Sequence, residues 1–176
     1  MTNPPRNSEP SDVEVGDTSP TAARVVVGVD GSGGSIAALR WAAGEASLRG
    51  VAVHVVMAWQ RPMQYGAPSM FGPGMDPSYD IEKSLAAAAA DETARLVEET
   101  RKERDVPMTW ETIEGHPAMA LLAVVEDADI LVVGSRGHGG FVSALLGSVS
   151  QHVVAHARCP VIVIPGSERH TRVDQA

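Results

Sequence analysis

The sequence Gly134-Ser135-Arg136-Gly137, followed after nine residues by Gly147-Ser148, decides how this chain is expected to fold. An aliphatic run at 130–133 precedes the first of these glycines, and a helical pattern begins at Val149. A strand that ends in glycines and leads into a helix N-terminus directs several backbone N–H groups at one point, which favours a bound anion. The stretch therefore predicts a phosphate site between a strand and a helix.

Alternating strand and helix patterns extend outward from this stretch. Strands are predicted at 25–29, 51–59, 108–113, 129–133 and 160–164. Helices are predicted between the turn at 30–35 and Gly50, and at 80–104, 116–127 and 148–157. Nearly continuous aliphatic strands are typical of a parallel sheet that is covered on both faces. Because βαβ crossovers are right-handed, the pattern predicts a three-layer α/β/α fold with a five-stranded parallel, Rossmann-like sheet.

The composition indicates one domain with flanking tails. With 176 residues and 44% hydrophobic residues, the chain has enough apolar surface for one good core. We predict a single domain at 23–167 that contains a long flexible loop at 60–79, rich in Pro, Gly and Met. Residues 1–22 are polar and Pro-rich and are predicted to be a disordered tail, and 168–176 form a short C-terminal tail.

Charge and cysteine content exclude several classes of partner. The formal charge of −8, without a cluster of Lys and Arg, argues against binding to nucleic acid. No segment approaches the roughly 18 apolar residues of a membrane span, so no membrane association is predicted. The one cysteine, Cys159, rules out an internal disulfide. These features predict a cytoplasmic protein.

Two other phosphate-binding designs fit the sequence less well. A Walker loop needs Lys and then Ser or Thr after its second glycine, but His138 follows Gly137 and no such motif occurs elsewhere. Gly31-Ser32-Gly33 begins like a dinucleotide fingerprint, but its third glycine position is Ile36 and no acidic residue ends the next strand. The split site at Gly134, Gly137 and Gly147-Ser148 therefore remains the best candidate.

The spacing of these glycines resembles that of the universal stress protein family in its ATP-binding branch. Three further features carry the resemblance: Asp30 after the first strand, His54-Val55 in the second, and the closing segment 159–165. Together they cover about 23–167. The resemblance implies the strand order 3-2-1-4-5, in which the order reverses between the first and fourth strands. Ligands bind at such reversals, so Asp30 and Gly134 are expected to meet at one crevice.

The resemblance also implies which residues bind ATP. In outline, the nucleoside lies by the first strand, the adenine by the backbone of the second, and the phosphates by the glycine loop and the last helix. The implied contacts, in that order, are Val29 and Asp30; Val55; Val133, Gly134, Arg136 and Gly137; and Gly147, Ser148 and Val149.

Some of these residues keep a second interpretation. Ser148 could cap the last helix or donate its hydroxyl to a phosphate. Arg136 could add charge at the phosphates or lie in solvent. Asp30 would suit a ribose hydroxyl or a Mg²⁺ shell. His152 and His156 have the spacing of a metal pair, but the sequence shows no obvious third ligand, so no metal site of the protein's own is predicted.

The leading hypothesis is an ATP-binding regulatory protein of the universal stress type, acting with Mg²⁺ in the stress response. No nucleophile or general base stands out, so binding is preferred over turnover and no catalytic residue is predicted. The alternatives are a slow ATPase or adenylyl-transferring enzyme on the same site, and a nucleotide-free interaction module. The apolar strand at 160–164 would lie at a sheet edge, and a homodimer through it is predicted, as the resemblance also suggests.

Overall fold

The computed structural model describes residues 23–61, 77–126, 129–138 and 145–166, and backbone alone at 77–80. The predicted tails, and all but the two ends of the predicted loop at 60–79, lie outside the described residues. The extent of the predicted single domain at 23–167 therefore stays a prediction.

In the part of the chain that the structure describes, five parallel strands form one sheet in the order β3-β2-β1-β4-β5, which confirms the predicted fold and order. At the centre of the sheet, Val25 pairs with Val53 on one side and with Ile130 on the other. The strands are β1 (Val25–Val29), β2 (Val53–Trp59), β3 (Met108–Glu114), β4 (Ile130–Gly134) and β5 (Val161–Ile164).

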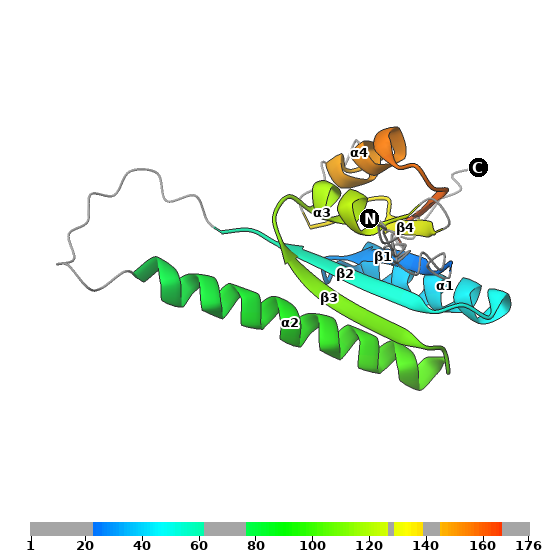
Figure 1. Ribbon diagram of the computed structural model, residues 1–176, viewed down its shortest axis with the longest axis horizontal. Helices are drawn as coiled ribbons and strands as arrows, with labels where there is room; N and C mark the ends of the chain where they lie inside the picture. Colours follow the sequence, from blue (N-terminus) through cyan, green and yellow to red (C-terminus); the bar gives the residue numbers. More distant parts are fainter. Residues whose placement is uncertain (1–22, 62–76, 127–128, 139–144, 167–176) are drawn as a thin grey trace, which may run out of the picture.

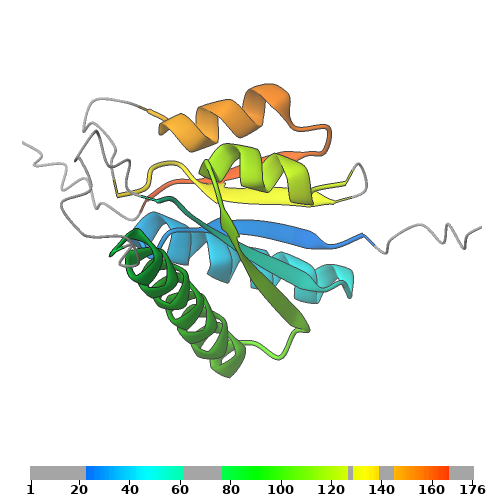
Figure 2. The same cartoon turned by 60° about the vertical axis from the view of Figure 1, so that its left-hand side comes forward.

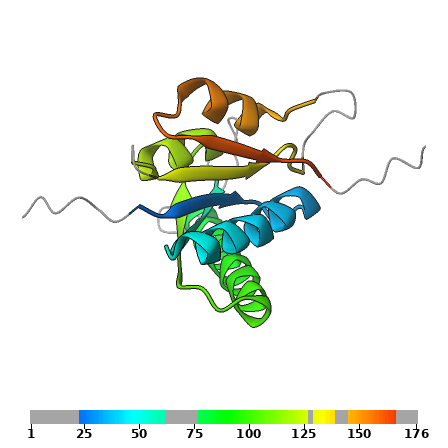
Figure 3. The same ribbon diagram turned by 90° about the vertical axis from the view of Figure 1, so that its right-hand side faces the viewer.

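Within the described residues, four helices cover the two faces of the sheet, and Figure 3 shows the sheet between them. They are α1 (Gly33–Arg49), α2 (Pro77–Glu103), α3 (Pro117–Val124) and α4 (Ser148–His156). Figure 2 shows α1 and α2 on one face and α3 and α4 side by side on the other, which gives the predicted three layers. In Figure 1, α2 runs well past the end of the sheet toward its own N-terminus.

The central strands are buried on both faces, which explains their continuous aliphatic sequence. Val25 and Val27 belong to the core cluster under α1 and α2, whereas Val26 belongs to the cluster under α3 and α4, and none of the three is exposed. A strand with one wet face would alternate apolar and polar residues, but β1 has no wet face.

Several element boundaries differ from the predicted ones. The second strand begins at Val53 rather than at residue 51, because Val51 still donates its N–H to Ala46 O at the end of α1. The second helix begins at Pro77 rather than at residue 80, which shortens the predicted loop; proline suits a first helical turn. The third helix ends at Val124 rather than at residue 127, because Val125 is already extended. Gly50 ends α1 as predicted, with φ 68°.

A partly buried ion pair joins the first and fourth strands at the end of the sheet where they begin. Asp129 is only 2% exposed and accepts hydrogen bonds from Arg24 N, Arg24 Nε and Glu126 N. The other end of the Arg24 guanidinium donates to Val124 O at 2.8 Å. Removing either partner would leave buried polar groups without compensation, so we assign this pair a structural role.

Candidate functional site

The candidate site lies where β1 and β4 end side by side. These two strands are neighbours, and β2 and β5 lie beyond them on opposite sides, so the strand order reverses between them. In a sheet of this kind, a crevice opens beyond the carboxyl ends of the two strands. The residues that follow β1 and β4, including Asp30 and Ser135, line or flank that crevice.

The first turn of α1 opens onto the crevice through a hydrogen-bonded turn. Ser32 caps the helix, and its Oγ accepts from Ser35 N at 3.2 Å. The hydroxyl of Ser35 donates to Ser32 O at 2.9 Å and accepts from Asp30 N at 3.3 Å. Gly31, between Asp30 and Ser32, takes φ 80°, a conformation that favours glycine. The turn fixes the helix N-terminus, where free N–H groups attract negative charge.

Two glycines let α1 contact the loop after β4. A Cβ on Gly134 would lie 2.9 Å from Gly34 C, and a Cβ on Gly34 would lie 2.8 Å from Arg136 O. Real Cβ atoms do not approach other atoms so closely, so any side chain at either position would push the helix and the loop apart. Gly134 is predicted to let the backbone approach a ligand closely. In the structure, it lets the backbone of the loop approach the backbone of α1.

The N-terminus of α4 is anchored to the same loop. Gly147 is the N-cap residue and donates its N–H to Ser135 O at 2.7 Å. Ser150, only 2% exposed, donates its hydroxyl to Gly134 O at 2.7 Å and lies 3.2 Å from Ser135 O. The capping role considered for Ser148 is wrong, because Gly147 holds the cap position without a side-chain hydrogen bond and Ser148 is the exposed first residue of the helix.

Asp30 connects the two loops. Its Oδ1 accepts from Ser32 N at 3.0 Å, and its Oδ2 accepts from His138 N at 3.3 Å. Partial burial raises the pKa of the Asp30 carboxyl, but hydrogen bonds from Ser32, Ser35 and His138 outweigh this effect and hold the pKa below its ordinary value of 3.8. A Cβ on Gly137 would collide with Asp30 Oδ2, so any other residue there would require the carboxylate to move from the position that accepts these hydrogen bonds.

A second carboxylate lies at the rim of the crevice. Glu92 Oε1, on α2, is 3.3 Å from the point where a Cβ of Gly31 would lie, and His138 Nε2 is 3.7 Å from that point. Arg95 donates to both oxygens of Glu92, at 2.7 and 2.9 Å, and this pairing lowers the pKa of the Glu92 carboxyl. Helix α2 therefore places an ion pair beside Gly31, in the turn between β1 and α1.

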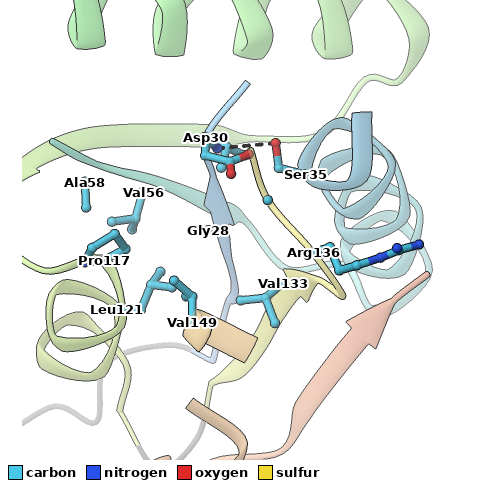
Figure 4. Close-up of a pocket in the computed structure, with 13 residues that line it drawn as sticks. Gly28, Asp30, Ser35, Val56, Ala58, Pro117, Leu121, Val133, Arg136 and Val149 are labelled. Carbon is cyan, nitrogen blue, oxygen red and sulfur yellow. Dashed lines mark hydrogen bonds between the residues drawn. The ribbon is translucent and has the colours of Figure 1, made fainter. Parts of the chain in front are cut away.

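A pocket of about 90 Å³ opens at the crevice, several times the roughly 10–15 Å³ that one water molecule needs on the same measure. Figure 4 shows its apolar residues, including Val56, Pro117 and Leu121, gathered on one side and Asp30 with Ser35 on the other. The lining consists of Gly28, Val29, Asp30, Ser35, Val56, Ala58, Pro117, Leu121, Val133, Gly134, Arg136, Gly137 and Val149. The pocket can therefore take a ligand with one flat apolar part and one polar part.

Most of the predicted contacts come together in this pocket. The seven that line it are Val29, Asp30, Val133, Gly134, Arg136, Gly137 and Val149. Gly147 and Ser148 begin α4 beside it but do not line it, and a Cβ on Gly147 would lie 3.5 Å from Arg136 Cα. In Figure 4, the side chain of Arg136 extends away from the apolar side of the pocket.

Val55 is the predicted contact that the structure places elsewhere. Its side chain is fully buried in the cluster under α1 and α2, on the face of the sheet opposite the pocket wall. Val56 and Ala58, on the same strand, line the pocket instead. The resemblance implied a contact through the backbone of Val55. That contact stays a prediction, because Val55 does not line the pocket.

Sequence reasoning missed the apolar wall. Pro117 and Leu121 come from α3, and a Cβ on Gly28 would lie 2.8 Å from Leu121 Cδ1, so glycine in β1 lets α3 come close. The one available signal was the apolar face of the third helix, which gives no indication of what it covers. Ser35, whose position in the first turn of α1 could have suggested it, was also missed.

Two features are absent from the described part of the chain. There, no three or more His, Cys, Asp or Glu side chains are grouped so that they could hold a metal ion. Nor is any helix within it long and apolar enough to cross a membrane.

Comparisons with known proteins agree with the fold. Universal stress protein Rv2005c of Mycobacterium tuberculosis is 39% identical over 147 residues, which cover 82% of this chain and 46% of that protein. The chain spans about half the length of the curated relatives that it matches.

Solved structures share the architecture. The universal stress protein UspA from Lactobacillus plantarum has a TM-score of 0.68 at 23% identity, with 81% of this chain and 97% of that chain covered. The universal stress protein from Archaeoglobus fulgidus, solved in complex with dAMP, has a TM-score of 0.50 at 27% identity, with 81% of this chain and 97% of that chain covered.

A sequence model of one protein family matches nearly all of the residues that the structure describes. The model described as the universal stress protein family matches residues 22–165, which include all five strands, all four helices and the crevice between β1 and β4. This chain belongs to the universal stress protein family.

Proposed function

We propose that the crevice binds ATP with Mg²⁺ and that nucleotide occupancy regulates the protein in a stress response. The observation that carries this proposal is the convergence of two helix N-termini, α1 and α4, and the loop at 134–138 on one pocket with an apolar wall. Helix N-termini favour phosphates, and the apolar wall suits a purine base.

The apolar and polar parts of the pocket match the base, ribose and phosphates of a nucleotide. The adenine would lie against Val56, Pro117 and Leu121, which form the apolar side. The Asp30 carboxylate suits ribose hydroxyls, which donate hydrogen bonds to it. The phosphates would follow the loop at 134–137 toward the start of α4, where no acidic residue lies in the first turn.

Carboxylate chemistry supports the metal in this proposal. Mg²⁺ prefers oxygen ligands and is commonly held by one or two carboxylates together with substrate phosphates. Asp30 is ionised at neutral pH, because its pKa is lowered, and it lies at the crevice. When bound, Mg²⁺ would neutralise phosphate charge beside this carboxylate; Glu92 is already paired with Arg95.

The relative from Archaeoglobus fulgidus adds support for an adenine ligand. That protein was solved with dAMP and is 27% identical to this chain over most of its length. A monophosphate would use only part of the donors at the two helix N-termini described above. We propose the triphosphate as the ligand of this chain because both N-termini and the intervening loop face one crevice.

Binding is preferred over turnover for a chemical reason. A general base must be able to take up a proton near neutral pH. The carboxylate at the crevice, Asp30, already accepts two hydrogen bonds, and its lowered pKa makes it a weaker base. A slow ATPase or adenylyl-transferring activity remains the alternative, and a nucleotide-free interaction module is the third possibility.

The test is to identify the nucleotide that the purified protein carries. Wild-type protein and a Gly147→Val variant would be denatured, and any released nucleotide identified by chromatography and mass. Gly147 has φ −74° and ordinary space around a Cβ, so the variant is expected to fold while its side chain fills the phosphate path. We expect ATP from the wild type alone; a wild type that stays empty after incubation with ATP and Mg²⁺ would favour the interaction module.

We also propose that the protein is cytoplasmic and forms a homodimer through β5. Strand β5 is an edge strand, and all four of its aliphatic side chains are only partly buried. The other edge, β3, carries Thr109, Glu111, Thr112 and Glu114, and such polar residues discourage pairing with another chain. The apolar edge is therefore the better surface for a second copy.

A further inference from the structure

The buried side chain of His54, on β2, makes two hydrogen bonds that the nucleotide site does not use. Its Nδ1 lies 2.8 Å from Thr109 Oγ1, and its Nε2 lies 2.7 Å from Glu111 Oε1. The imidazole is only 9% exposed, whereas Thr109 lies at the surface. A hydroxyl, an imidazole and a carboxylate therefore form one hydrogen-bonded row that begins in solvent.

The pairing of β2 with β3 brings these three side chains together. In the parallel register, Thr109 pairs with His54 and Glu111 pairs with Val56. Side chains two residues apart on a strand project from the same face, so Thr109 and Glu111 both lie on the face of His54. Val56 belongs to the core cluster under α3 and α4, which identifies this face. Because all three groups come from paired strands, their relative positions are better fixed than those of groups on loops.

The carboxylate determines which nitrogen of His54 carries the proton. Because a carboxylate can only accept a hydrogen bond, Nε2 donates to Glu111. In the neutral ring Nδ1 is then an acceptor, and the hydroxyl of Thr109 donates to it. A hydroxyl bonded to a base that a third group orients is the arrangement of nucleophilic catalysis. In this arrangement Thr109 is the nucleophile, His54 the base and Glu111 a positioning residue.

The edge of the sheet adds a hydrogen-bond donor and access from solvent. Gly115, directly after β3, donates its N–H to Trp59 O on β2. Because peptide groups alternate in direction along a strand, the N–H of Trp110 faces outward from β3. In α/β-hydrolases, the N–H of the residue after the nucleophile stabilises the negative oxygen of the intermediate, and Trp110 directly follows Thr109. Figure 2 shows the beginning of β3 at the open edge of the sheet, away from α3 and α4.

We propose that Thr109, His54 and Glu111 form an acyl-transfer site that hydrolyses small carboxylic esters. Thr109 Oγ1 attacks the carbonyl carbon while its proton passes to His54 Nδ1, and Trp110 N–H donates to the oxygen that becomes negative. The bond from carbon to the leaving group then breaks, and the alcohol departs with the proton from His54. A water molecule next gives a proton to His54 and attacks the acyl carbon. The bond to Thr109 Oγ1 breaks, Thr109 recovers the proton, and a carboxylic acid is released.

The charge and position of the site limit its substrates. The side chain of Glu111 is 45% exposed, so its carboxylate repels anionic acyl groups and favours uncharged esters. His54 and Thr109 are each the second residue of their strand, whereas the nucleotide crevice lies beyond the carboxyl ends of β1 and β4. The site is therefore separate from the crevice, and the proposal does not rest on the proposed function.

The first test measures hydrolysis of p-nitrophenyl acetate, a small uncharged ester, by tag-free full-length protein without nucleotide. Thr109→Val removes the hydroxyl at nearly constant volume and should bring the rate down to that of buffer, whereas Thr109→Ser should keep activity. His54→Gln removes the base and should lower the rate by about 10²–10⁴-fold. Glu111→Gln should lower kcat and leave KM unchanged, because Glu111 orients the base without touching the ester.

Two matched variants control for these changes. Thr112→Val makes the same substitution on the opposite face of β3, and His156→Gln makes it at an exposed histidine on α4. Both should hydrolyse the ester at the wild-type rate. Circular dichroism would show which variants are folded, since an unfolded chain would not report on the site.

The second test identifies the acylated residue in the wild type and needs no variant. Protein that has reacted with p-nitrophenyl acetate would be quenched in acid, digested and analysed by mass spectrometry. We expect the acetyl group on Thr109. A wild type that is no faster than buffer, acetyl groups only at other residues, or full activity in a folded Thr109→Val variant would each overturn the site. Gly147→Val should hydrolyse the ester at the wild-type rate, so a failure of the nucleotide proposal would leave this site standing.

Discussion

The carboxylate of Asp30 joins loops that lie 108 residues apart in the chain, through its hydrogen bond from His138 N. The same carboxylate accepts from Ser32 N at the start of α1. It therefore orders both halves of the crevice before any ligand arrives. A residue expected only as a ligand contact is also part of the structure that forms the site.

We predict that Asp30 contributes stability that acid removes. Because its folded pKa lies below 3.8, the ionised form is favoured by folding; the stabilisation is complete above the unfolded pKa and is lost as the pH falls through the folded pKa. The free energy of unfolding of wild type and Asp30→Asn would be compared from pH 6 to pH 2. The difference between them should shrink below about pH 4; a difference that stays constant would contradict the assignment.

Replacement of Gly137 by alanine tests the contact between the loop and Asp30. The backbone of Gly137 is not in the left-handed region, so the penalty comes from the collision of the new Cβ with Asp30 Oδ2. Because the exposed Asp30 carboxylate can move away, we expect a loss of only about 0.5–1.5 kcal/mol in the free energy of unfolding, the net contribution of a hydrogen bond that the movement breaks, together with weaker nucleotide binding. Urea denaturation would measure the first and calorimetry with ATP the second.

Gly33→Ala is the matched control for this change, because no atom lies within 4 Å of a Cβ at that position. The second control is Asp30→Ala, which removes the atom that collides. In that background the additional cost of Gly137→Ala should largely disappear. An undiminished cost would mean that the strain lies elsewhere in the loop.

For single residues, the sequence could indicate which glycines matter, but not every contact that requires a glycine there. Gly134 is predicted to leave room for phosphate, yet its nearest obstacle is the backbone of Gly34 in α1. No local pattern reports a contact between residues a hundred positions apart. Likewise, β2 is buried on both faces, so the sequence could not indicate that Val56 rather than Val55 has its side chain at the pocket.

Ser150 helps to hold helix α4 at the crevice. Its buried hydroxyl bonds to Gly134 O, so the helix start and the end of β4 form one unit. This residue follows the predicted Ser148 by two positions, and nothing in the sequence distinguishes the two serines. The two serines differ only in the direction in which their side chains project from the helix. Ser150 points into the protein and bonds to the loop, whereas Ser148 is exposed.

We predict that Ser150→Ala destabilises the protein by about 1–3 kcal/mol, the cost of leaving a buried polar group without its partner. Ser148→Ala removes the same hydroxyl from the exposed first position of α4 and should change the free energy of unfolding by less than about 0.5 kcal/mol. Chemical denaturation of both variants would measure this. Equal effects would mean that the Ser150 hydrogen bonds contribute no net stability.

Helix ends are the other features that the sequence predicted only approximately. The third helix stops three residues early because Val125 turns extended, although the apolar spacing includes that residue. Apolar spacing reports which residues face a core, not which backbone hydrogen bonds are made. Gly50 was predicted correctly because a left-handed residue at a helix end has a strong chemical preference.

For the whole molecule, the alternation of strands and helices predicted the architecture, and the family resemblance supplied the strand order. Covered parallel strands have a distinctive sequence, and right-handed crossovers leave few topologies. The opposing apolar wall of the crevice could not be predicted in the same way. It is formed where α3 meets β1 through Gly28, and that contact exists only after the sheet has formed.

The two edges of the sheet differ in what they offer to a second copy. Pro160 O accepts from a residue of β4, and Ile164 O accepts from Ser135 N directly after it. Because peptide groups alternate in direction along a strand, those of Val161 and Val163 face outward from β5. On the other edge, Pro107 O accepts from β2. Because peptide groups alternate in direction along a strand, every second peptide group of β3, including that of Thr112, faces outward. Each edge therefore has free main-chain donors, but only β5 surrounds them with aliphatic side chains.

We predict a dimer of twice the chain mass of 18.5 kDa by light scattering at tens of micromolar. Val163→Pro removes an outward N–H from β5 without removing a bond to β4, and it should yield a folded monomer. Thr112→Pro makes the equivalent change on β3 and should remain a dimer. Circular dichroism would show that both variants are folded, since an unfolded chain would not report on the interface. A monomeric wild type would refute the interface, and a dimeric Val163→Pro variant would move it away from this edge.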